Sequence, residues 1–260
     1  METWLIVISA VVGVLLGYPM EIMVERVPEK LSPGPPWMVC DTCGNGFSTI
    51  SSISPIAIFY HAKRCRHCGS ERDWPLRPLL LATVSGIVLA GASIRFGVNV
   101  DLVAYDLLAA GLIVLSAIDL ERMIVPVRVL YPTLGGFAAL LAVSSLVDGR
   151  LEHLWVAAAS GLVCFLIFFA IHFIVPQGMG FGDVRLAGLL GFASGWIGVP
   201  QVLVGFVVAF GLGAITGILL MALKSYGAKS RLPFAPFLVA GTFVTLMWGT
   251  PMAKVWLHAA

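Results

Sequence analysis

Eight mostly apolar runs divide this 260-residue sequence and constrain it more than any other feature. A helix needs roughly 20 apolar residues to cross the hydrocarbon core of a bilayer. Hydrophobic residues make up 59% of the chain and charged residues 12%, whereas soluble domains carry about 25% charged residues. We therefore predict an all-α, polytopic membrane bundle of about eight transmembrane helices, at roughly residues 3–24, 78–97, 101–118, 129–147, 152–175, 184–199, 201–223 and 234–250.

The basic residues fall mostly in one set of alternate connections between these runs. The opposite set holds only Arg95, Arg150 and Lys254. Because cytoplasmic loops are enriched in Lys and Arg, the asymmetry predicts a multi-pass protein with both termini on the non-cytoplasmic side. The net charge is only +2 and the basic residues are spread over several loops, so we expect membrane lipids as partners and no nucleic acid.

Residues 25–77 form the one long polar loop, which predicts three domains: a first helix over 1–24, a loop domain over 25–77 and a membrane core over 78–260. The loop contains two Cys-x-x-Cys pairs, and such pairs are typical of tetrahedral zinc sites. A cytoplasmic location keeps thiols reduced, which favours metal over the alternative of free or disulfide-bonded cysteines. We predict a structural zinc ion held by Cys40, Cys43, Cys65 and Cys68.

A carboxylate, Asp183, lies where the chain re-enters an apolar run after the glycine-rich stretch Gly178-Met179-Gly180-Phe181-Gly182. Gly180 and Gly182 allow a sharp turn or a close approach of another segment. Ionisable groups at membrane depth usually face a protein interior or a water-filled cavity, which suggests a functional site. The alternative is that Asp183 only caps the next helix, because Asp is favoured there.

A second carboxylate, Asp119, has a similar position at the predicted cytoplasmic end of the run over 101–118. If Asp119 and Asp183 meet across a cavity, they titrate as a pair that shares one proton. Such a pair suits hydrolysis, since one carboxylate activates water while the other polarises a carbonyl. A proton-coupled transporter would also place paired aspartates in its helices. Against the transporter, neither aspartate lies near the middle of a run and the two halves show no inverted repeat.

Taken together, these motifs resemble the bacterial type IV prepilin peptidases, which are membrane aspartyl proteases of the GxGD type. The resemblance covers nearly the whole chain. It is carried by the run from Gly180 to Asp183, by Asp119 followed by Val125-Pro126 where the family has Ile-Pro, by Arg26-Val27-Pro28, by both cysteine pairs, by Trp74-Pro75-Leu76, and by Leu232-Pro233-Phe234-Ala235-Pro236-Phe237 where the family has Gly in place of Ala235.

The resemblance implies an enzyme of the bacterial cytoplasmic (inner) membrane that cleaves the leader of type IV prepilins or pseudopilins after a glycine. Asp119 and Asp183 would be its catalytic residues, with Gly180 and Gly182 in the active-site loop. Many family members also methylate the new N-terminus with S-adenosylmethionine. Two departures bear on that activity, because Tyr18-Pro19-Met20-Glu21 and Arg77-Pro78 stand where the family often has Ser-Phe-Leu-Asn and Val-Glu.

Overall fold

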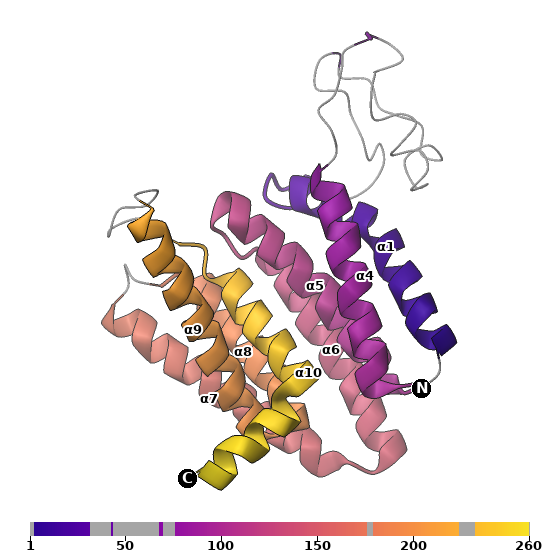
Figure 1. Ribbon diagram of the computed structural model, residues 1–260, viewed down its shortest axis with the longest axis vertical. Coiled ribbons are helices and arrows are strands. Elements are labelled where there is room, and N and C mark those ends of the chain that lie inside the picture. The colour runs from indigo at the N-terminus through magenta and orange to yellow at the C-terminus, as the bar shows by residue number, and fades with distance from the viewer. Residues whose placement is uncertain are drawn as a thin grey trace. The chain divides into compact units, whose positions relative to one another are not determined.

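The protein is described by a computed structural model over residues 3–31, 43, 68–69, 76–175, 179–223 and 232–259, with no side chains described beyond Trp248. All regular secondary structure in these residues is helical, which confirms the all-α prediction (Figure 1). The helices are α1 (Thr3–Arg26), α4 (Leu76–Phe96), α5 (Val100–Arg122), α6 (Val127–Asp148), α7 (Leu151–Ile174), α8 (Phe181–Ile197), α9 (Val199–Ala222) and α10 (Ala235–Ala259).

Six of these helices are long and apolar enough to cross a membrane, so the chain is a multi-pass membrane protein. They are α1, α4, α5, α6, α7 and α9. Helix α8 has only 17 residues, and the apolar described part of α10 is the shorter segment Ala235–Trp248. The expectation of eight transmembrane helices is therefore supported for six, and the crossing of α8 and α10 stays a prediction.

The chain forms two compact units, Met1–Gly97 and Val98–Ala260. In the first unit, α1 packs closely along α4. A side-chain carbon added at Gly17 would lie 2.4 Å from the Cα atom of Ala82, so only glycine permits this approach. Ser85 donates a hydrogen bond from Oγ to the Gly13 carbonyl oxygen at 2.6 Å. Small residues spaced four apart, here Gly13 and Gly17, are a common means of bringing membrane helices together.

The same helix pair is joined by charge where the polar loop leaves α1 and enters α4. Arg77 Nε donates hydrogen bonds to the two carboxylate oxygens of Glu21 at 2.7 and 2.9 Å. Arg77 Nη2 also contacts Glu25 at 2.9 Å. Glu21 is buried and needs such a partner, because an unpaired charge in an apolar environment is costly.

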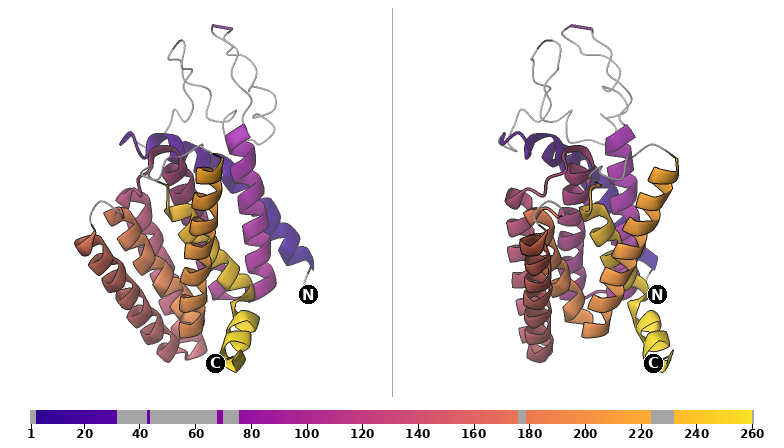
Figure 2. Two further views of the ribbon diagram at one scale, coloured as in Figure 1. Left: turned by 60° about the vertical axis from the view of Figure 1, so that its left-hand side comes forward. Right: turned by 90° about the vertical axis from the view of Figure 1, so that its left-hand side faces the viewer.

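In the second unit, α8 is the central helix and packs against α6, α7, α9 and α10 (Figure 2). Its closest neighbour is α7, because small residues face each other where the two helices meet. A side-chain carbon added at Gly191 would lie 2.7 Å from the Cβ atom of Cys164. Being surrounded explains why α8 is apolar on almost every face. Packing on several sides also holds α8 in place, and the first turn of α8 carries Asp183.

Candidate active site

Asp119 lies in the last turn of α5 and is only 5% exposed. A carboxylate there is disfavoured by the negative end of its own helix dipole. The first residue of α10 compensates, because the backbone N–H of Ala235 donates a hydrogen bond to Asp119 Oδ2 at 3.1 Å. The positive end of α10 is thus aimed at the carboxylate. The proline-rich segment before α10 is the part of the sequence that delivers this donor.

Asp183 is the third residue of α8, and Gly180 is the N-cap. The Asp183 N–H donates to the Gly180 carbonyl at 3.1 Å, and the Asp183 carboxylate turns back toward Gly180, with Oδ2 3.4 Å from the position of an added side-chain carbon there. A carboxylate that reaches back to the N-cap N–H is the second half of a capping box. Asp183 therefore does close the first turn of α8, as one of the two sequence interpretations required.

The start of α8 and the end of α5 are brought to the same place in the second unit. The segment after α5 is the link, since a side-chain carbon added at Gly182 would lie 2.8 Å from the Cβ atom of Val125. Glycine at 182 lets α8 approach this segment. Asp119 and Asp183 therefore lie at the same end of the second unit. Capping α8 and lying near a second carboxylate are thus compatible roles for Asp183.

Two interacting carboxylates in a partly buried site have a defined chemical capacity. Their charges repel, so the pair favours a state with one proton between them. That state offers a proton acceptor and a proton donor at once, as general acid–base hydrolysis requires. The N–H of Ala235 adds a fixed donor that orients the Asp119 carboxylate.

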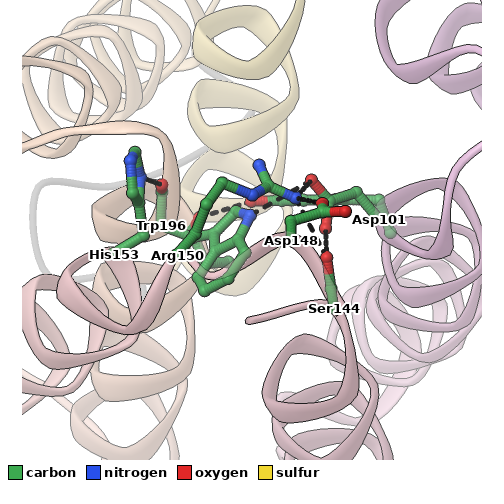
Figure 3. Close-up of polar contacts among 8 residues, drawn as sticks. Asp101, Ser144, Asp148, Arg150, His153 and Trp196 are labelled. Atoms are coloured by element: carbon green, nitrogen blue, oxygen red, sulfur yellow. Dashed lines mark hydrogen bonds and ion pairs between the residues drawn. The ribbon is translucent and has the colours of Figure 1, made fainter. Parts of the chain in front are cut away.

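A second polar cluster occupies the opposite end of α5 and connects four helices (Figure 3). At its centre is Asp101, which is 4% exposed. Asp101 accepts hydrogen bonds from Ser144 Oγ at 2.6 Å, from Arg150 Nη2 at 3.0 Å and from Trp196 Nε1 at 3.4 Å. The Arg150 guanidinium also lies 5.3 Å from the centre of the Trp196 ring and pairs with Asp148.

Arg150 provides the positive charge of this cluster. Burial lowers the pKa of Arg150, but the hydrogen bonds and negative charges of Asp101 and Asp148 outweigh it and raise that pKa above the ordinary value. The group therefore stays charged, and the buried Asp101 carboxylate keeps its counter-ion. The sequence indicated only an acid at a helix start for Asp101, because its partners lie 43, 49 and 95 residues away.

Two of the four predicted zinc ligands lie outside the described residues. Cys40 and Cys65 lie outside them, and Cys43 and Cys68 are described only as isolated positions away from any helix. Within the described part of the chain, no three His, Cys, Asp or Glu side chains gather as a metal site. The zinc site and the loop domain over 25–77 therefore stay predictions.

Comparison with known proteins supports the assignment of these aspartates to one domain. Residues 107–222 match the type IV leader peptidase family, and this range contains both Asp119 and Asp183. No solved structure is significantly similar to this one.

Several bacterial proteins are similar to the chain over most of its length. It is 31% identical to a prepilin leader peptidase/N-methyltransferase of Burkholderia pseudomallei (strain 1026b) over 237 residues, which cover 87% of this chain and 72% of that protein. It is 26% identical to the protein of that name in Bacillus subtilis (strain 168), with 95% and 96% of the two chains covered. The protein of that name in Pseudomonas aeruginosa PAO1 is 24% identical, with 97% and 93% covered. These similarities confirm the resemblance found in the sequence: the chain belongs to the type IV leader peptidase family, the prepilin peptidases.

Proposed function

We propose that this protein is an aspartyl endopeptidase that removes the leader from type IV prepilins or pseudopilins by means of Asp119 and Asp183. The observation that carries the proposal is that two aspartates 64 residues apart in the sequence lie at helix ends that meet, because the first turn of α8 at Gly182 approaches Val125 just after the end of α5. Family membership supports the substrate class, since the similar proteins are named prepilin leader peptidases.

The proposed reaction uses the two carboxyl groups in turn. The ionised carboxylate takes a proton from water as the water oxygen attacks the scissile carbonyl carbon. The protonated carboxyl gives its proton to the carbonyl oxygen, which produces a tetrahedral diol. The proton taken from water then passes to the amide nitrogen as the C–N bond breaks, and the diol returns a proton to the other carboxylate. Donor and acceptor exchange roles within one cycle, as expected of a coupled pair.

The predicted orientation suits this substrate. The excess of Lys and Arg predicts that the aspartates lie at the cytoplasmic side, where an apolar pilin helix can stay in the bilayer while its leader remains among cytoplasmic loops. The scissile bond then reaches the carboxylates without crossing the membrane.

The test is cleavage of a prepilin by purified Asp119→Asn and Asp183→Asn variants, with products weighed by mass spectrometry. Each change removes a proton acceptor while keeping the side-chain shape, so we expect a loss of at least about 100-fold, the lower range for acid–base catalysis. Glu152→Gln is the matched control, because Glu152 is exposed at the start of α7. Near-normal turnover by either Asn variant would overturn the assigned pair.

The same assay separates a peptidase from the alternative, a proton-coupled transporter. A transporter would leave the prepilin mass unchanged, and its Asn variants would lose proton flux into proteoliposomes instead of product formation. Leader loss with no proton flux supports the peptidase.

N-terminal methylation is a second proposed activity, because the similar proteins are named as N-methyltransferases too. The two departures from the family pattern, at residues 18–21 and 77–78, contact each other through Arg77 and Glu21. Adding S-adenosylmethionine to the cleavage assay decides the matter: a methylated product shows the activity, and an unchanged product mass shows its loss.

A further inference from the structure

An apolar groove with a cation at one end lies on the side of α8 that faces away from Asp183. It has a volume of about 500 Å³ and is lined by α6, α7 and α8. Arg185 is the one charged residue among its described lining residues. Because successive helix residues are rotated by about 100°, Asp183 and Arg185 lie roughly 200° apart around α8. The groove is therefore separate from the proposed active site.

Two aromatic rings hold Arg185 in place. Its guanidinium lies 4.4 Å from the centre of the Phe181 ring and 5.9 Å from that of Tyr131. Within the described part of the chain, no carboxylate lies at ion-pair distance from Arg185. Ring contacts fix the guanidinium plane but leave its N–H groups able to bind an anion. A cation at membrane depth without a counter-ion is costly, so the site favours an anionic ligand.

The dimensions of the groove fit a single acyl chain. Along α8 its lining extends from Phe181 to Phe192, which is about 16 Å of helix. One leaflet of the hydrocarbon core is roughly 15 Å deep, so the groove extends over about one leaflet. A helix 10–12 Å across needs roughly 1,300–1,900 Å³ over that length, more than the groove provides.

We propose that this groove binds an anionic phospholipid, with its phosphate on Arg185 and one acyl chain between Leu162 and Phe192. The apolar walls take the chain, and the charge selects the headgroup. The bound lipid packs against the face of α8 that is opposite Asp183. The inference does not depend on the peptidase proposal, because lipid binding is measured without substrate.

The first test measures lipid retained by the purified full-length protein in detergent, by native mass spectrometry. Phosphatidylglycerol and phosphatidylcholine with the same acyl chains are the probes. We expect the wild type to prefer phosphatidylglycerol, and Arg185→Gln to bind it roughly fivefold more weakly, the factor for one basic residue at a membrane surface. Arg128→Gln is the matched control, since Arg128 is exposed at the start of α6 and does not line the groove.

A second pair of variants tests the acyl-chain site without changing any charge. Ala158 and Ala159 are neighbouring exposed residues of α7, but only Ala158 lines the groove. Ala158→Trp fills the groove and is expected to remove the retained phosphatidylglycerol, whereas Ala159→Trp keeps it. Equal retention of both lipids by the wild type, or unchanged retention in Arg185→Gln and Ala158→Trp, would overturn the proposal.

A photo-crosslinking amino acid at Leu162 identifies the occupant directly. A phospholipid adduct supports the proposal. An adduct with the mass of an added prepilin, or of a second copy of this chain, in place of the lipid would assign the groove to that partner and contradict it.

Discussion

At the scale of single residues, the orientation of the Asp119 carboxylate depends on a hydrogen bond that no local sequence pattern reveals. The sequence identified Asp119 by its position beside an apolar run and by a family motif. It gave no sign that the Ala235 N–H, 116 residues away, would donate to its carboxylate. Only tertiary packing brings the start of α10 to the end of α5. The resemblance of residues 232–237 to a family segment was the one available signal.

This contact predicts a specific effect of removing one N–H. Ala235→Pro deletes the donor at the first residue of α10, where proline suits helical geometry. A hydrogen bond to a charged group contributes about 1.5–3 kcal/mol, so prepilin cleavage should fall by roughly 10- to 100-fold while the melting temperature changes little. Ala235→Gly keeps the N–H and is the control. Equal kcat/KM for the two variants would show that the contact does not matter for catalysis.

At the scale of secondary-structure elements, hydropathy located the helices well and their ends poorly. Helix α5 was expected to end near residue 118 but continues to Arg122, because Glu and Arg are good helix formers although they do not extend the apolar run. Helix α8 was expected from 184 but begins at Phe181. Both aspartates therefore lie inside helices and not beside them, which fixes their backbones more firmly than a loop would.

The cluster around Asp101 is also a property of packed elements and yields its own prediction. Arg150→Gln leaves Asp101 buried without its counter-ion. We expect it to lower the free energy of unfolding by about 3 kcal/mol. This value is the lower end of the range for breaking a buried ion pair, because Arg150 is partly exposed. The double variant Arg150→Gln/Asp101→Asn removes both charges and should recover part of the melting temperature. A double variant as unstable as the sum of its single changes would contradict a coupled pair.

At the scale of the whole molecule, composition was enough to predict a helical membrane protein, and a set of short motifs taken together was enough to find its family. The relation between the helices was not predictable from one sequence, since it depends on side-chain packing. The clearest case is the groove of α6, α7 and α8: its residues read only as apolar helix faces until the helices are packed together.

The predicted loop domain over 25–77 gives a prediction at the same scale. The purified protein should hold one zinc ion by elemental analysis, and Cys65→Ser should lose it, since each thiolate is one of four ligands. Cys164→Ala is the control, because Cys164 packs against α8.

Metal loss should speed proteolysis within 25–77 and leave some prepilin cleavage, because the aspartates belong to the second unit. A protease-resistant loop in metal-free wild-type protein would exclude the zinc site.

The meeting of Asp119 and Asp183 is tested most directly by crosslinking these two positions. The double variant Asp119→Cys/Asp183→Cys is treated with a short bis-maleimide in membranes, and the joined peptides are identified by mass spectrometry. Asp119→Cys/Glu152→Cys is the control pair, since Glu152 lies next to Arg150 at the other end of α5. We expect a crosslink between 119 and 183 and none in the control. Absence of the first crosslink, with both cysteines singly modified, would contradict a shared site.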